Sequence, residues 1–121
     1  VTRIAGTGKS GYTGDGGDPL RATFGSNPRE EFDGPWALSL DEDGNIFVGD
    51  MHNRVVRMVE KSSNQITTIA GHIDCQIGDR NDPLVRDPLK VNLPHIAGMY
   101  YFDGRLYITQ ETGDLVVLRK A

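Results

Sequence analysis

The sequence predicts an all-β fold built from a repeated antiparallel sheet, and three observations lead to this prediction. The chain of 121 residues contains 15 glycines and 6 prolines, which favours short elements joined by many turns over long helices. Short segments alternate apolar and polar residues, as half-buried strands do. The same order of motifs also occurs twice along the chain, so one structural unit is duplicated.

The duplicated unit has roughly 60–65 residues, and three pairs of matching segments show it most clearly. The pairs are VTRIAG (1–6) with ITTIAG (66–71), GDGGDPL (14–20) with GDRNDPL (78–84), and GPWALSLDEDGNIFVGD (34–50) with LPHIAGMYYFDGRLYIT (93–109). In the last pair Pro35 matches Pro94, which makes Trp36 and His95 equivalent residues at the start of each unit.

Each unit is predicted to form four short antiparallel strands. In the first unit the expected strands are 36–40, 45–50, 54–60 and 65–71. Asp43-Gly44 is a hairpin signal between the first two strands, and Asp103-Gly104 is its counterpart, so Gly44 and Gly104 are expected to be turn residues. The connector before the first unit has room for one helical turn within 18–24. Repeated four-stranded antiparallel sheets are the blades of a β-propeller.

The glycine-rich stretch at the N-terminus is not predicted to bind a nucleotide. Gly8-Lys9-Ser10 matches the end of a phosphate-binding loop, but that motif needs a glycine where this chain has Arg3, and it needs a helix to follow. The residues after Ser10 are too rich in glycine to start a helix. We therefore interpret the stretch as a connection between strands and expect no cofactor.

Metal binding is also not predicted. DEDGN (41–45) has its glycine two positions too early for a calcium loop, and Asp15 and Asp18 are interpreted as turn residues that bond local backbone. The single cysteine, Cys75, excludes an internal disulfide and a cysteine-based zinc site. The formal net charge of −4 argues against a nucleic-acid partner, and no apolar run approaches the ~20 residues of a membrane span.

The run PWALSLDEDGNIFVGDMHNRVVRMV (35–59) resembles the NHL repeat, and IAGTGKSGYTGDGG (4–17) is similar to the connector of bacterial NHL proteins. This resemblance covers one unit strongly and the second weakly, and it implies about two blades of a six-bladed propeller. It also implies that Asp50 and Asn53 are structural residues whose side chains bond loop backbone. Gln110 and Gly113 stand at the matching positions of the second unit, so that loop is expected to be held differently.

The resemblance and the repeat together divide the chain into five parts. These are an outermost strand of a preceding or closing blade (1–6), a connector (7–33), an NHL blade (34–71), a second connector (72–92) and a second, incomplete blade (93–121). Two blades cannot close a ring. The remaining blades are therefore expected from a longer parent chain, or from other copies of this chain, of which three would supply six blades.

The chain looks like the C-terminal part of bacterial surface proteins that join an IPT/TIG domain to an NHL propeller. This implies an extracellular or cell-surface location, including that of an outer-membrane lipoprotein, and a non-catalytic scaffold that binds a protein or a glycan. The candidate ligand-binding residues are Trp36, His95, His52 and Arg54. The alternative is a propeller hydrolase or lyase whose channel metal is held partly by missing blades. The three histidines, which include His72, lack a recurring ligand spacing, so we do not expect an enzyme.

Overall fold

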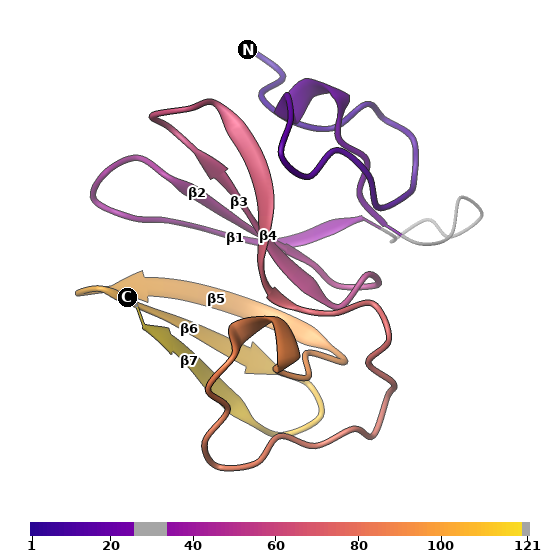
Figure 1. Cartoon of the computed structure of the whole chain (residues 1–121), viewed down its shortest axis with the longest axis vertical. Helices are drawn as coiled ribbons and strands as arrows, with labels where there is room; N and C mark the ends of the chain where they lie inside the picture. The colour runs from indigo at the N-terminus through magenta and orange to yellow at the C-terminus, as the bar shows by residue number, and fades with distance from the viewer. Residues whose placement is uncertain (26–33, 120–121) are drawn as a thin grey trace.

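The computed structural model describes residues 1–25 and 34–119 and contains two antiparallel β-sheets stacked on one another (Figure 1). The first sheet has the strand order β1-β2-β3-β4, and the second has the order β5-β6-β7. The strands are β1 Pro35–Leu40, β2 Ile46–Asp50, β3 Val55–Glu60, β4 Gln65–Gly71, β5 Ile96–Phe102, β6 Arg105–Gln110 and β7 Leu115–Arg119. The predicted all-β class is confirmed, and each strand expected in the first unit lies within one residue of its predicted bounds.

The described residues of the second unit form the three strands β5, β6 and β7. Residues 26–33 of the predicted connector 7–33, and the last two residues of the predicted blade 93–121, lie outside the described residues. No helix in the described part of the chain is both long enough and apolar enough to cross a membrane.

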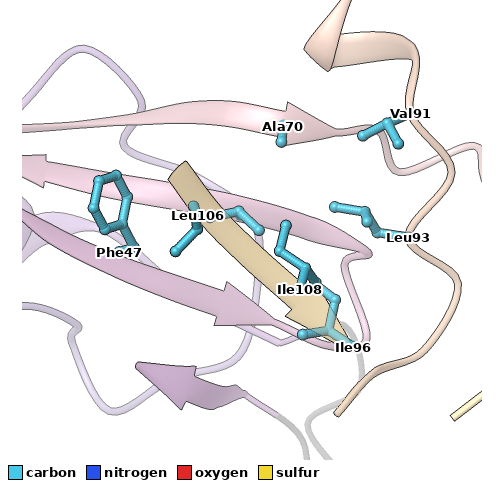
Figure 2. Packing of buried hydrophobic residues seen from close by; sticks show 8 residues of the cluster. Phe47, Ala70, Val91, Leu93, Ile96, Leu106 and Ile108 are labelled. Carbon is cyan, nitrogen blue, oxygen red and sulfur yellow. The ribbon is translucent and has the colours of Figure 1, made fainter. Parts of the chain in front are cut away.

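The main hydrophobic core lies between the two sheets (Figure 2). Phe47, Val56 and Ala70 of the first sheet face Ile96, Leu106 and Ile108 of the second, and Val91 and Leu93 of the second connector complete the buried cluster. The rings of Phe47 and Tyr101 stack with their centroids 5.9 Å apart. Because strand side chains alternate between faces, this core uses only one face of each sheet.

A second hydrophobic cluster covers the opposite face of the first sheet. Val48, Val59 and Ile66 of this face pack against Ala22 and Phe24 of the N-terminal segment. This segment lies on the side of the first sheet that is remote from the second sheet (Figure 1). The N-terminal connector is therefore packed on the sheet that follows it in sequence.

A single 3-10 turn precedes each sheet, namely η1 Pro19–Arg21 and η2 Pro88–Lys90. The helical turn predicted within 18–24 is thus confirmed. The match of 14–20 with 78–84 was wrong, however, because the structural counterpart of Asp18-Pro19-Leu20 is Asp87-Pro88-Leu89. The reason is core packing, since η1 is followed by the buried pair Ala22 and Phe24 and η2 by the buried pair Val91 and Leu93.

The two hairpins have different turns. In the second sheet Phe102 pairs with Arg105, and Asp103 and Gly104 have φ values of 49° and 78°, as a two-residue type I′ turn requires. In the first sheet Leu40 pairs with Ile46, so the loop has five residues. The Asp41 carboxylate organises this loop by accepting hydrogen bonds from the Asp43 and Asn45 amides, both at 2.9 Å.

Residues 1–6, predicted as an outermost strand, do not form a strand in this structure. A strand needs a hydrogen-bonded neighbour, and β4 already occupies the outer position of the first sheet. The Gly6 amide instead donates to the Pro19 carbonyl at 2.9 Å. Pairing of this segment with a different blade stays a prediction.

The buried Arg57 side chain on β3 joins the N-terminal connector to the first sheet. Its guanidinium donates to the Asp15 carboxylate at 3.0 and 3.1 Å, and to the carbonyl oxygens of Thr13 and Thr23, both at 2.7 Å. The side chain is fully buried, whereas that of Asp15 is 37% exposed. Three separate points of the connector are therefore bonded to one side chain, which we call the Arg57 clamp.

Aromatic rings enclose the guanidinium of the clamp. Arg57 Cζ lies 5.2 Å from the ring centroid of Tyr12 and 4.9 Å from that of Phe24, within the range of cation–π attraction. Burial raises the pKa of Tyr12, so its hydroxyl is protonated at neutral pH and donates to Asp15 Oδ2 at 3.3 Å. The sequence analysis interpreted Asp15 as a turn residue, and the structure corrects this because the carboxylate is the partner of a buried cation.

The clamp does not recur in the second unit. Arg57 pairs with Val48 of β2, and the corresponding residue of β6, Ile108, pairs with Val116. Val116 therefore occupies the position of Arg57 in the second sheet. The second connector is held to its sheet by the apolar contacts of Val91 and Leu93 and by the hydrogen bond from Gln110 Nε2 to the Asn92 carbonyl.

We expect Gly44→Val to lower the free energy of unfolding by more than about 1 kcal/mol, because Gly44 has a φ of 85° that a β-branched residue resists. Urea unfolding of both proteins measures the difference. Gly44→Asn is the matched control, since asparagine adopts positive φ more readily, and it should cost clearly less. Equal costs for the two variants would contradict the argument.

We expect Arg57→Met to destabilise the protein by about 2–4 kcal/mol, because it leaves the Asp15 carboxylate without its charged partner and removes the guanidinium hydrogen bonds to the Thr13 and Thr23 carbonyls. Urea unfolding measures the loss, and Arg105→Met, at an exposed strand position, is the control with an expected change within about 0.5 kcal/mol. A double-mutant cycle with Asp15→Asn should show coupling between the two sites. Additive effects of the two substitutions would contradict a direct ion pair.

Candidate functional site

The connections β2–β3 and β6–β7 lie at the same end of the stack as the starts of β1 and β5. In the first sheet Pro35 pairs with Asp50, which pairs with Val55, which in turn pairs with Gly71. In the second sheet Ile96 pairs with Gln110. We call this end the loop end, and it carries all four candidate ligand-binding residues, namely Trp36, His52, Arg54 and His95.

Asp50 and Asn53 build the β2–β3 connection, as the resemblance implied. Both are buried. The Asp50 carboxylate accepts hydrogen bonds from the Gly25 amide at 3.0 and 3.1 Å. Asn53 Nδ2 donates to Asp50 at 2.8 Å and to the carbonyls of Gly11 and Gly25, both at 3.1 Å. These two side chains therefore tie the loop end of the first sheet to both ends of the described part of the connector.

Arg54 is held in an unusual backbone conformation beside this pair. Its φ of 60° lies in the left-handed region, where a residue other than glycine is uncommon. Its Nε atom is buried and donates to no atom of residues 1–25 and 34–119. His52, on the same connection, is partly buried. Arg54 thus offers a donor that the described protein atoms do not satisfy.

His95 lies directly before β5 and forms a polar contact with Glu111 that the sequence analysis missed. His95 Nδ1 is 2.9 Å from Glu111 Oε2, with both side chains partly exposed, and the Glu111 amide donates to the His95 carbonyl at 3.0 Å. The spacing along the sequence gave no signal for this contact, which exists because β5 and β6 begin and end together. His95 and Glu111 form a paired polar site on the second sheet.

The loop of the second sheet is held by a different set of side chains, as predicted. Gln110 Nε2 donates to Asp114 Oδ1 at 2.6 Å and to the Asn92 carbonyl at 3.2 Å. Asn81 also donates to the Asn92 carbonyl, at 2.8 Å. Gln110 of β6 thus donates to connector backbone in the second unit, as Asn53 does in the first.

Trp36 and His95 are not equivalent, which corrects the sequence analysis. Pro35 lies opposite Asp50, but Ile96, and not Pro94, lies opposite Gln110. The position of Trp36 therefore corresponds to the residue after Ile96. The alignment failed because it matched Pro35 with Pro94, whereas the strand register makes Ile96, two residues later, the counterpart of Pro35.

Trp36 faces a hollow on the first sheet. The hollow has a volume of about 610 Å³ and lies between residues 3–10 of the N-terminal segment and the strand residues Leu38, Ile46, Val48 and Val59. Its lining includes Trp36 but not His95, His52 or Arg54. The structure thus places Trp36 against an apolar surface, and the three other candidates on the loops.

No metal centre is formed by the described residues. Within 1–25 and 34–119, no three side chains of the His, Cys, Asp and Glu types converge in a way that could hold an ion. The carboxylates considered as calcium ligands have other partners, since Asp18 caps η1 through the Leu20 amide at 2.9 Å and Asp41 organises the first hairpin. The alternative of an enzyme with ligands from further blades stays a prediction.

Comparison with known proteins finds solved structures with a similar fold. A structural genomics protein of unknown function from Bacteroides thetaiotaomicron superposes with a TM-score of 0.72 at 20% sequence identity. The match covers 96% of this chain and 26% of that one, so this chain spans about a quarter of the length of its structural relative. No family model matches the sequence, and no curated protein matches it either.

We expect Cys75 to react slowly with a disulfide reagent while the protein is folded. The residue is fully buried, and burial raises the pKa of its thiol, so little reactive thiolate is present at mildly alkaline pH. The rate measured with Ellman's reagent should be at least about tenfold lower in the native chain than in the chain unfolded by urea. Equal rates would show that the second connector opens readily around this residue.

Proposed function

We propose that the two sheets are neighbouring blades of an NHL-type β-propeller, and that this propeller is a non-catalytic scaffold that binds a protein or a glycan at its loop end. The proposal includes a location outside the cell, at a bacterial surface. Two features support the blade arrangement. Successive four-stranded and three-stranded meanders pack face to face, and their first strands are adjacent, with the Tyr101 amide donating to Ser39 Oγ at 2.8 Å.

The single observation that carries the ligand-binding part is the donor set at the loop end. Arg54 Nε is buried without an acceptor among the described residues, next to a connection that Asp50 and Asn53 hold in place. Arg54 as a whole is only partly buried, so a small movement of its guanidinium would let a ligand oxygen accept from this donor, which is costly to leave unpaired. His52 and the His95–Glu111 pair add further polar groups at the same end of the stack. Hydroxyl and carbonyl oxygens of a glycan or a protein loop are suitable acceptors for these groups.

The proposal is tested by screening the chain on a glycan array and by measuring the affinity for the glycan that binds. We expect Arg54→Gln to weaken binding by about tenfold, because one charged donor is lost. Glutamine has no special preference for or against the φ of 60° relative to arginine, so the backbone cost is similar in both proteins. Arg86→Gln, on the exposed second connector, is the control and should bind as the wild type does.

His95→Ala provides a second test of the location of the site. It removes the polar contact with Glu111 without disturbing the core, because both side chains are partly exposed. If binding survives both Arg54→Gln and His95→Ala unchanged, the loop end is not the binding surface.

A further inference from the structure

We propose that this chain associates head to tail with a second copy of itself, through the outer face of its second sheet and the outer face of the first sheet of the other copy. The outer faces are those that do not contribute to the core between the two sheets. The inference rests on the blade arrangement proposed above, and it names the partner that covers the two faces.

The core between the sheets joins two unlike faces. The first sheet contributes a face with Phe47, Val56 and Met58, which we call a type A face. The second sheet contributes a face with Met99, Leu106 and Ile108, which we call a type B face. Each sheet also has one outer face, because successive side chains of a strand point to opposite sides.

The strand register identifies the outer face of the first sheet as type B. In the first sheet Leu38 pairs with Val48 and Leu40 with Ile46. In the second sheet the corresponding pairs are Met99 with Ile108 and Tyr101 with Leu106. Leu38 and Leu40 therefore correspond to residues that pack in the internal core, yet they are 62% and 54% exposed. The same positions are covered where a neighbouring sheet is present and open where none is.

The outer face of the second sheet is type A by the same criterion. Gly49 pairs with Val56 as Thr109 pairs with Leu115, so Leu115 corresponds to Val56. Val56 is fully buried, whereas Leu115 is 59% exposed. The exposed aromatic residues Tyr100 and Phe102 widen this apolar face. Contiguous apolar side chains of this kind on a soluble protein are typical of an interaction surface.

One outer face is therefore of type A and the other of type B, and a pair of such faces already packs together in the core between the two sheets. The hollow of about 610 Å³ that is lined by Leu38, Ile46 and Val48 provides the space into which a type A face would fit. Inside the molecule Phe47 of the type A face stacks on Tyr101. By the register, Tyr107 occupies the place of Phe47 and Leu40 the place of Tyr101, so we expect Tyr107 of one copy to contact Leu40 of the other.

A second copy is the occupant that these observations favour, because the chain itself presents both halves of the interface. An isologous dimer would instead place like faces together, A on A or B on B, which the internal core does not do. Head-to-tail contacts are heterologous, so they produce a closed ring or an open chain of copies.

Light scattering after gel filtration tests the association directly. The wild type should show a mass that rises with concentration in multiples of 13.3 kDa, with three copies corresponding to six sheets in a ring. Leu38→Glu and Leu115→Glu each place a charge on one outer face, and each should raise the dissociation constant by about tenfold or more. Leu84→Glu, at an exposed position of the second connector, is the control and should associate as the wild type does.

Mixing the two variants distinguishes a head-to-tail interface from an isologous one. Leu38→Glu keeps an intact type A face and Leu115→Glu keeps an intact type B face, so the mixture should form a 1:1 dimer that neither variant forms alone. An isologous interface predicts that only one of the substitutions impairs association and that mixing restores nothing. Circular dichroism checks that each variant is folded, and Leu40→Glu or Val117→Glu replaces a variant that is not.

A wild-type chain that stays monomeric at about 100 µM would overturn the proposal, and would leave unlike partners, such as further sheets of a longer polypeptide, to cover the faces. Failure of the mixed variants to dimerise would overturn it as well. These outcomes are distinguishable from failure of the proposed function. A monomer that still binds a glycan removes only the interface, whereas an oligomer that binds none removes only the ligand site.

Discussion

The structure depends on one constraint, which is that each sheet has two apolar faces and both must be kept from water. The first sheet meets this constraint in two ways, since its type A face packs on the second sheet and its type B face is partly covered by the N-terminal connector. The second sheet meets it on one face only. The order of the elements and the positions of the two buried pairs after the 3-10 turns follow from this requirement. The exposed leucines lie at both ends of the stack, on the faces that no second sheet covers.

The Arg57 clamp explains how a segment with so many glycines is held in one conformation. Connector backbone that is poor in side chains cannot be fixed by apolar packing alone, so it is fixed by hydrogen bonds from a few buried polar groups. Arg57 binds the connector near Thr13, Asp15 and Thr23, while Asn53 and Asp50 bind it near Gly11 and Gly25. The connector is therefore part of the first sheet's packing and not a loose tether between sheets.

The same bonds define the candidate binding surface. The polar atoms of Asp50 and Asn53 are hydrogen-bonded to the connector and to each other. Arg54, which lies between them and β3, has a donor that is not satisfied within the described chain. In the second sheet the corresponding loop is closed by Gln110 and Asp114, and the exposed polar groups are His95 and Glu111. The proposed ligand site and the proposed interface between copies use different parts of the molecule, namely the loop end and the sheet faces.

The sequence by itself determined the all-β class and the strands of the first unit, because alternation of side chains and turn residues are local properties of the chain, whereas the roles of Asp50 and Asn53 were implied only by the resemblance to the NHL repeat. Tertiary structure alone decided the role of Arg57, which was visible only as a charge between Val55 and Val59 on a strand, since its three connector partners lie 34 to 44 residues away. It also decided the alignment of the two units. Matching Pro35 with Pro94 made Trp36 equivalent to His95, but strand register follows the packing of faces, and it makes Ile96 the counterpart of Pro35. Local patterns depend on neighbouring residues of the sequence, whereas the role of a buried charge and the register of a strand depend on the segments that pack against them.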